Sequence, residues 1–371
     1  MSSRKRNKRL GITLMFLCFL LLFAGPLPAE TPASEPDLPF EEMFRKELEK
    51  GFKDPIGFHY YFKDGFRSES PGGRLKIKIG GEARLDGGYL GANDTLKRTF
   101  SDLPGWKGNF RELKVRLSGS LYENWKFQFD MDFANVRQIK DIWISYGKIP
   151  FIGEAKVGHT KVPFSLEGFM SNADRTFMEI ALPVEAFFPG RNIGILCQNT
   201  ALNDRMTWAA GYFLLTGSFS DVADATDYLS NAFGSSVTFR VTGLPRYEDD
   251  GKNFLHLGFS YSHQFRDYTR EDSQLKLRAH PESRLTDDTF VNTGQFYTEA
   301  ADLIGYEAAI VQGPLSIQGE LFQVFTNAES VGDPKFWGGY VYGSYCLTGE
   351  HRPYDRSKGI FKGVVPNKDF H

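Results

Sequence analysis

From residue 75 onward, apolar and polar residues alternate along the chain with a period of two. Leu75, Ile77, Ile79, Gly81, Ala83, Leu85, Gly87 and Tyr89 fall on one face, and Lys76, Lys78, Glu82, Arg84 and Asp86 on the other. Successive side chains of a β-strand point to opposite faces, so this alternation predicts a strand. Its length exceeds the ~5–6 residues usual in soluble sheets and suffices for the ~9–11 residues of a tilted membrane strand.

The same alternation predicts eleven further strands. They are residues 113–121, 126–133, 139–148, 155–164, 192–199, 206–214, 236–244, 254–265, 303–312, 315–325 and 336–347. Tight turns at 122–125 and 313–314 contrast with long connections at 91–109, 167–190, 216–234 and 266–301. Alternating short turns and long loops are typical of outer-membrane barrels.

Two architectures could accommodate such strands. A half-buried soluble sheet would keep its charged face in water, but its aromatic face would need a second layer that no helix of the sequence supplies. A closed barrel satisfies both faces and every backbone hydrogen bond. We therefore predict an all-β fold, an antiparallel transmembrane β-barrel over residues 75–347 with a short N-terminal helix.

The N-terminus has the order of a secretory signal. Five basic residues within residues 4–9 precede the apolar run 10–24, and a small residue, Ala29, follows. A membrane anchor is disfavoured because a spanning helix needs roughly 20 apolar residues. We predict that residues 1–29 are cleaved and that the chain is exported to the outer membrane of a Gram-negative bacterium.

Residues 30–74 predict a periplasmic linker and one amphipathic helix. Phe44, Leu48 and Phe52 recur at helical spacing within the charged run 40–53. Such a helix could contact a partner subunit or the peptidoglycan. Packing as a solvated helix on the barrel rim is the favoured interpretation.

Composition agrees with a barrel. Mean hydropathy is only −0.35, as expected when alternate residues face lipid, and the chain holds 34 Phe, 16 Tyr and 5 Trp. Without residues 1–29, 39 basic residues face 46 acidic ones, a net charge of about −7 that gives no sign of nucleic-acid binding. Cys197 and Cys346 could pair in the periplasm, but two small apolar strand residues are the favoured interpretation.

Recognisable catalytic signatures are absent, including HExxH, CxxC, GxGxxG, GxSxG and the Walker loop. A membrane-embedded esterase would need an exposed Ser and His, and Ser171, Asn172 and His159 lack the spacing for it. We expect no enzyme, no cofactor and no metal site.

Basic residues mark the predicted lumen. Lys76, Lys78, Arg84, Lys114, Arg116 and Lys126 project from the polar face of the first three strands, among Glu82, Asp86, Glu112, Asp130 and Asp132. The wall could be a water-filled lumen with paired charges. Alternatively, the basic residues form a track that attracts small anions by their local field.

Several ordered motifs resemble the phosphate-selective porin O and P family. They are LYENWKFQFDMDF (121–133), KVGHTKVPFSLE (156–167), SNADRTFME (171–179), LPVEAFFPGRNIG (182–194) and YCLTGEHRPY (345–354), with further matches at 256–262 and 281–283. The resemblance covers about residues 73–365. It implies a trimeric, anion-preferring channel whose loop after the fifth strand folds inward to form the constriction.

The resemblance also implies anion-contacting residues. By position they are Lys161 at the end of the fifth strand, Arg175 in the inward loop, and Arg191 after the Pro189–Gly190 corner. Ammonium and guanidinium groups can replace the hydration of a phosphate by charge-assisted hydrogen bonds. Which anion permeates, phosphate, polyphosphate or another, stays open.

The C-terminal end departs from the family. Members of that family resemble a sixteen-stranded barrel. In this chain about twelve strands are recognisable, and residues 348–371 carry no alternating strand. A barrel lacking its last strands would leave two sheet edges unpaired. We expect residues 348–371 to be a tail marking a probable truncation point, with a complete twelve-stranded barrel as the alternative. A non-conducting barrel remnant is therefore the second functional hypothesis.

Overall fold

The computed structural model describes residues 40–100, 103–134, 138–216, 232–267, 269 and 273–368. The chain divides into two units, Met1–Glu47 and Leu48–His371. The predicted signal, residues 1–29, lies outside the described residues. Helix α2 (Phe40–Lys50) confirms the predicted amphipathic helix, and Met43, Phe44 and Leu48 on it are exposed. Among the helices described, none is long and apolar enough to span a membrane.

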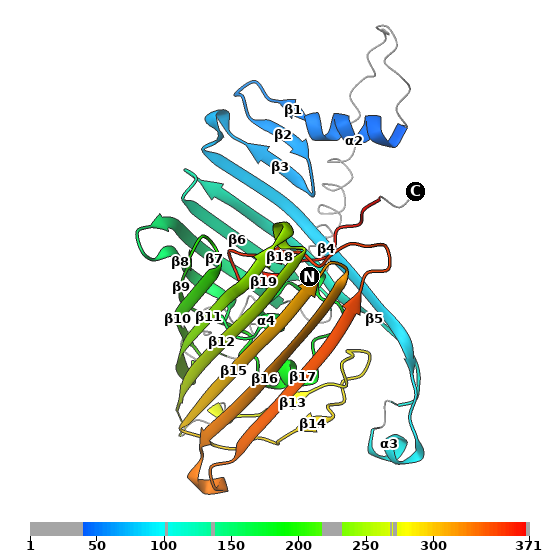
Figure 1. Cartoon of the computed structure of the whole chain (residues 1–371), viewed down its shortest axis with the longest axis vertical. Coiled ribbons are helices and arrows are strands. Elements are labelled where there is room, and N and C mark those ends of the chain that lie inside the picture. The colour runs from blue at the N-terminus through cyan, green and yellow to red at the C-terminus, as the bar shows by residue number, and fades with distance from the viewer. Residues whose placement is uncertain are drawn as a thin grey trace, which may run out of the picture. The chain divides into compact units, whose positions relative to one another are not determined.

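All twelve predicted strands are present in one antiparallel sheet (Figure 1). They are β4 (Leu75–Leu90), β5 (Gly105–Leu121), β6 (Trp125–Asp132), β7 (Gln138–Ile149), β8 (Gly153–Lys161), β9 (Arg191–Ala201), β10 (Met206–Leu214), β11 (Gly234–Glu248), β12 (Asn253–Arg266), β15 (Ala300–Gln312), β16 (Leu315–Asn327) and β17 (Lys335–Tyr345). Each pairs with its neighbour in the chain, because hairpin connections join antiparallel strands.

Three short strands precede β4 within residues 30–74, the segment predicted to be a linker with one short helix. They are β1 (Phe52–Lys53), β2 (His59–Phe62) and β3 (Phe66–Glu69), followed by the 3-10 turn η1 (Pro71–Gly73). β3 pairs with residues 76–79 of β4 and extends the sheet. At two to four residues, these strands are too short for a period of two to stand out from a loop.

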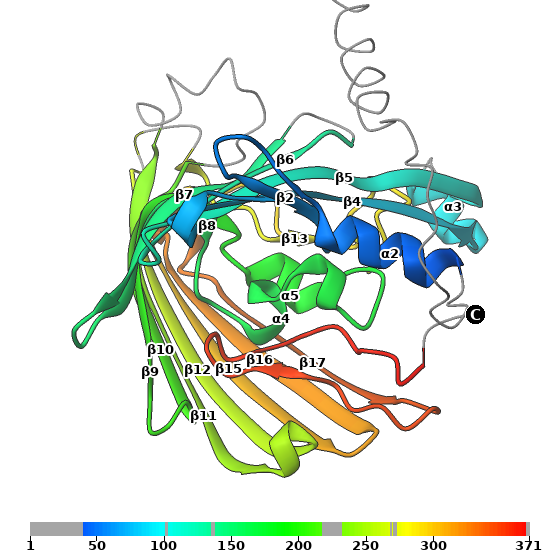
Figure 2. The ribbon, with the colours of Figure 1, turned by 90° about the horizontal axis from the view of Figure 1, so that it is seen from above.

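The sheet is strongly curved, and α4, α5 and the C-terminal segment lie within its curve (Figure 2). Strand order runs from β1 to β17, and no pairing among the described residues joins these two strands. In this structure the sheet therefore has two edges, as the count of about twelve strands led us to expect, and the alternative of a closed twelve-stranded barrel is not what it shows.

Burial along the strands is the reverse of that in a soluble protein. On β15 and β16, Glu307, Gln318 and Glu320 are at most 4% exposed. Tyr306, Ile317 and Leu321, which alternate with them, are 41–44% exposed. Apolar side chains that point away from the concave side are typical of a wall that faces lipid.

The connection 162–190 folds onto the concave side of the sheet, as the family resemblance implied. It holds α4 (Leu166–Phe169), the 3-10 turn η2 (Asn172–Asp174) and α5 (Leu182–Phe187). The buried Phe322 of β16 lies between Phe164 and Phe187, with ring centroids 5.9 Å and 6.1 Å away. This aromatic packing attaches the connection to a strand far along the chain.

A polar contact reinforces that attachment. The Glu320 carboxylate of β16 accepts hydrogen bonds from the backbone N–H groups of Leu166 (2.7 Å) and Glu167 (2.9 Å). These N–H groups begin α4 and have no partner within the helix, so the carboxylate satisfies donors that would otherwise be buried unpaired.

Residues 348–368, within the predicted tail, also pack inside the curve of the sheet. They contain β18 (Tyr354–Asp355) and β19 (Ile360–Phe361). The buried Arg240 of β11 donates to the carbonyl oxygens of Lys358 (3.0 Å) and Gly359 (2.8 Å), and Phe361 packs on Phe254. The remaining elements are α3 (Asp94–Thr99), β13 (Arg278–Ala279), β14 (Val291–Asn292), and the 3-10 turns η4 (Asp249–Gly251) and η6 (Glu329–Val331).

We expect Phe322→Ala to destabilise the attachment of the 162–190 connection. Removing a fully buried aromatic ring typically costs ~3–5 kcal/mol. Denaturant unfolding of the refolded protein in detergent, together with limited proteolysis within residues 162–190, measures the effect. Phe325→Ala is the matched control, because Phe325 lies on the same strand but points outward. Equal loss of stability in both variants would contradict this role of Phe322.

Candidate functional site

The pairing register of the sheet places basic residues of separate strands at the same height along the strand direction. Lys161 of β8 pairs with Arg191 of β9, and Lys140 of β7 lies two residues before Ile142, which pairs with His159. Further round the sheet, Ile193 pairs with Leu214, Leu214 with Ser235, and Ser235 with Phe265. Arg266 therefore lies within one residue step of the level of Arg191.

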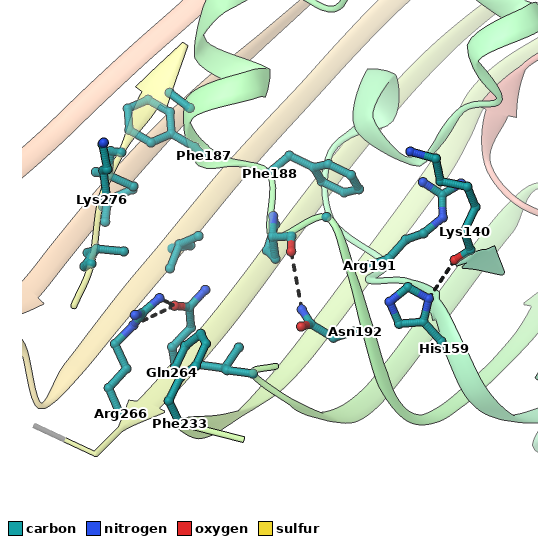
Figure 3. Close-up of a pocket in the computed structure, with 18 of the residues that line it drawn as sticks. Lys140, His159, Phe187, Phe188, Arg191, Asn192, Phe233, Gln264, Arg266 and Lys276 are labelled. Carbon is teal, nitrogen blue, oxygen red and sulfur yellow. Dashed lines mark hydrogen bonds between the residues drawn. The ribbon is translucent and has the colours of Figure 1, made fainter. Parts of the chain in front are cut away.

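At this level there is a cavity of about 390 Å³ between the sheet and two inward connections (Figure 3). Its wall comes from β7, β8, β9, β12, β15 and β16, and the connections contribute residues 186–190 and 275–277. The lining contains four cations, Lys140, Arg191, Arg266 and Lys276, and also His159. No described carboxylate lines it, so its field is positive.

Two of the cations are backed by carboxylates outside the lining. Arg191 donates to Asp141 at 3.0 Å and 3.2 Å, and Lys140 Nζ lies 3.7 Å from Asp132. Each carboxylate holds its cation in place and offsets part of the cation's positive charge.

The other two cations keep their full charge. Arg266 donates to the side-chain oxygen of Gln264 (3.0 Å and 3.2 Å) and to the carbonyl of Ser273 (2.8 Å), all neutral acceptors. Lys276 is exposed and bonds to none of the described residues. The cavity is therefore more positive on this side.

Lys161 and Arg175, predicted as anion contacts, brace the inward connection. Lys161 Nζ donates to the carbonyl oxygens of Gly168 (3.0 Å) and Met170, and Arg175 forms an ion pair with Glu179 at 3.4 Å. Burial lowers the pKa of the Arg175 guanidinium to about 10. Arg191 is the one member of this predicted trio that lines the cavity.

The six basic residues predicted on the first three strands are spread along the wall. Arg116 binds both carboxylate oxygens of Asp130, Lys114 lies 2.7 Å from Glu112, and Arg84 lies 3.8 Å from Asp86. Lys76 and Lys126 share a level with Ser120, at the Tyr122–Trp125 end of the strands, and Lys78 lies two residues along from Lys76. These residues agree better with a mixed wall than with a purely cationic track.

Sequence reasoning missed Lys140, Arg266 and Lys276. Lys140 and Arg266 lie near the ends of strands that were predicted, and Lys276 lies in a long connection. Their proximity depends on the pairing register and on the inward fold of two connections, neither of which a single strand pattern specifies.

A network of ion pairs fixes the two inward connections to each other and to the wall. Glu185 of α5 accepts from His280 (2.7 Å) and from Arg284 in the connection 267–299. Glu179 pairs with Arg111 of β5. Because these side chains are largely buried, their mutual pairing satisfies charges that would be costly alone.

Asn172, one of the residues weighed for an esterase, donates to Glu112, and His159 Nδ1 bonds to the carbonyl oxygen of Lys140. Cys197 and Cys346 are both free thiols. Among the residues described, no group of three His, Cys, Asp or Glu side chains could hold a metal ion.

Comparison with known proteins identifies the family. Residues 77–369 match the family model of phosphate-selective porin O and P. The chain belongs to this family.

Two curated relatives match most of this chain. Porin O of Pseudomonas aeruginosa is 26% identical over 326 residues, which are 80% of this chain and 68% of that protein. An uncharacterised protein of Caulobacter vibrioides is 25% identical over 316 residues, 83% of this chain and 58% of that protein. The chain therefore spans about three fifths to two thirds of the length of these relatives.

Solved outer-membrane proteins also align. OmpT of Vibrio cholerae, solved as a trimer, aligns over 78% of this chain and 94% of its own, with 9% identity and a TM-score of 0.32. OprB of Pseudomonas putida aligns over 80% and 79%, with 8% identity and a TM-score of 0.35.

We expect Glu167→Gln to stabilise the protein at neutral pH. Burial raises the pKa of this carboxyl above its usual 4.5, while its Oε2 accepts a hydrogen bond from Ala181 N–H (3.0 Å). A raised pKa in the folded state means that stability is lost as pH rises from 4.5 through the folded value. Glutamine keeps an acceptor and carries no charge, so this loss should disappear.

The measurement is the melting temperature of both proteins in detergent from pH 4 to pH 8. The difference should be near zero at pH 4 and favour the variant at pH 8. Glu329→Gln, in an exposed turn, is the control and should change neither value. A variant less stable than the parent at pH 8 would refute the burial effect.

Proposed function

We propose that the chain is an outer-membrane porin through which small anions, phosphate-like anions included, diffuse passively. The observation that supports this proposal is a cavity lined by four cations and by no described carboxylate. The cavity lies between the wall and the connection that narrows the interior. Family membership supports a channel and gives no reason to expect an enzyme.

Such a site suits permeation because its cations replace part of an anion's hydration. Arginine and lysine donate charge-assisted hydrogen bonds to anionic oxygens, and apolar walls strengthen the local field. Conduction also requires that the ion leave again, so binding must stay moderate. The ion pairs of Arg191 and Lys140 moderate it by offsetting part of their charge.

Within this proposal the predicted basic residues take four roles. Arg191 contacts the anion directly, whereas Lys161 and Arg175 hold the inward connection and add to the local field. Lys114, Arg116 and Arg84 belong to the ion-paired wall, and Lys76, Lys78 and Lys126 attract anions near the end of the strands marked by short turns.

We further propose export by the signal at residues 1–29 and assembly as a homotrimer in outer-membrane lipid, as the family resemblance implies. N-terminal sequencing of the exported protein tests the cleavage after Ala29. Native mass spectrometry in detergent tests the trimer, and a monomer at every protein concentration would contradict it.

A non-conducting barrel is the second candidate, favoured by the packing of residues 348–368 inside the curve of the sheet. Conductance of the purified protein in a planar bilayer separates the two. The porin proposal requires stepwise currents with a reversal potential that favours anions, and their absence in both chloride and phosphate would overturn it.

Replacing Arg266 and Lys276, which pair with no described carboxylate, should weaken anion preference. We expect Arg266→Gln with Lys276→Gln to lower the permeability ratio of chloride to potassium at least fivefold, because two unit charges ~8 Å from the ion each stabilise chloride by ~0.5 kcal/mol and oppose potassium. Reversal potentials in a potassium chloride gradient measure this. Lys252→Gln, in the exposed β11–β12 turn, is the control and should leave the ratio unchanged.

Removing the partner of Arg191 should act in the opposite direction. Asp141→Asn deletes one negative charge while leaving an acceptor for the guanidinium, so the chloride to potassium ratio should rise about twofold. Arg191→Gln should lower it by a similar factor. If both variants shift the reversal potential in the same direction, Arg191 does not set the charge of the cavity.

A further inference from the structure

The cavity described above has cations at two separate places. Lys140 and Arg191 lie on one side of it, and Arg266 and Lys276 lie on the other, with Phe188 between them (Figure 3). Inorganic phosphate is compact and would occupy one of these places. An arrangement in two parts points to a longer ligand.

The spacing between neighbouring strands gives the distance between the two groups of cations. Arg191 begins β9 and Arg266 ends β12, and β10 and β11 lie between them. Three steps of ~4.8 Å place the two backbones about 14 Å apart across the sheet. Because both side chains extend into the cavity, their guanidinium groups are close enough to hold the two ends of one small molecule.

Apolar side chains contribute to the surface between the two ends. They are Phe187 and Phe188 of the inward connection, Phe233, Leu277, and the wall residues Leu303 and Val324. Phe187 and Leu303 are less than 10% exposed. A hydrated inorganic ion gains nothing from such a surface, whereas the hydrocarbon body of an organic anion gains ~25 cal/mol for each Å² removed from water.

Charge balance favours two negative charges on the ligand. Four cations line the cavity, and Asp132 and Asp141 are the carboxylates paired with them among the described residues. Counted over the described residues, the remaining charge of two matches a dianion. A volume of about 390 Å³ lies in the range of small-molecule sites, ~300–1,000 Å³.

We infer that this cavity binds organic dianions in which an apolar body separates two anionic groups, with Arg191 and Lys140 at one end and Arg266 and Lys276 at the other. The inference rests on the proposed anion channel and narrows its substrate class. Aromatic or medium-chain dicarboxylates have this chemistry.

The test is binding to the full chain in detergent, measured by isothermal titration at fixed ionic strength. The probes are terephthalate, benzoate and inorganic phosphate. We expect terephthalate to bind at least 10-fold more tightly than either of the others, which corresponds to ~1.4 kcal/mol. Benzoate has the same aromatic ring but only one carboxylate. Phosphate is charged but has no hydrocarbon body.

Variants separate the two parts of the site. Arg266→Gln with Lys276→Gln should reduce terephthalate affinity to that of benzoate. Phe233→Ala and Phe188→Ala should each weaken terephthalate at least threefold and leave phosphate unchanged. Lys252→Gln is the control. Melting temperatures identify a variant that has lost its fold, and the second phenylalanine variant then decides the role of the apolar surface.

Each outcome has one meaning. Equal affinity for terephthalate and benzoate would overturn the two-ended site, and equal affinity for terephthalate and phosphate would overturn the organic ligand. Either result leaves the anion channel intact, because its own test is the reversal potential in a planar bilayer. A channel without anion preference that still binds terephthalate tightly would instead refute the proposed function alone.

Discussion

The outward orientation of the apolar strand residues is the constraint on which the rest of the structure depends. Because Tyr306, Ile317 and Leu321 point away from the concave side, each strand must place polar residues such as Glu307 and Gln318 inside. A polar interior cannot be filled by a hydrophobic core alone. Each buried charge there needs a partner from another strand or an inward connection.

The inward connections supply those partners. Glu320 satisfies the first N–H groups of α4, Arg240 binds carbonyl oxygens of the C-terminal segment, and Glu185 binds His280 and Arg284. Apolar packing around Phe322 accompanies these contacts. The interior is therefore a largely paired polar network, and the basic cavity stands out because its described lining contains cations without carboxylates.

This explains why the fold was easier to predict than the site. A period of two over nine or more residues is a local signal, and all twelve strands carrying it were found. β1, β2 and β3 were missed because two to four residues hold too little of that signal. Of the predicted anion contacts, Arg191 lines the cavity, whereas Lys161 and Arg175 bond to the connection itself. Lys276 could not be distinguished from any other lysine of a long connection.

The sequence by itself determined the strands, the side of each that carries the apolar residues, and the family, because each follows from residues close together in the chain. Only the tertiary structure decided which cations share a cavity and which are offset by carboxylates. Arg191 and Arg266 are 75 positions apart in the chain and meet through the register of four strands. Since a net field depends on distances in space, no local pattern specifies it.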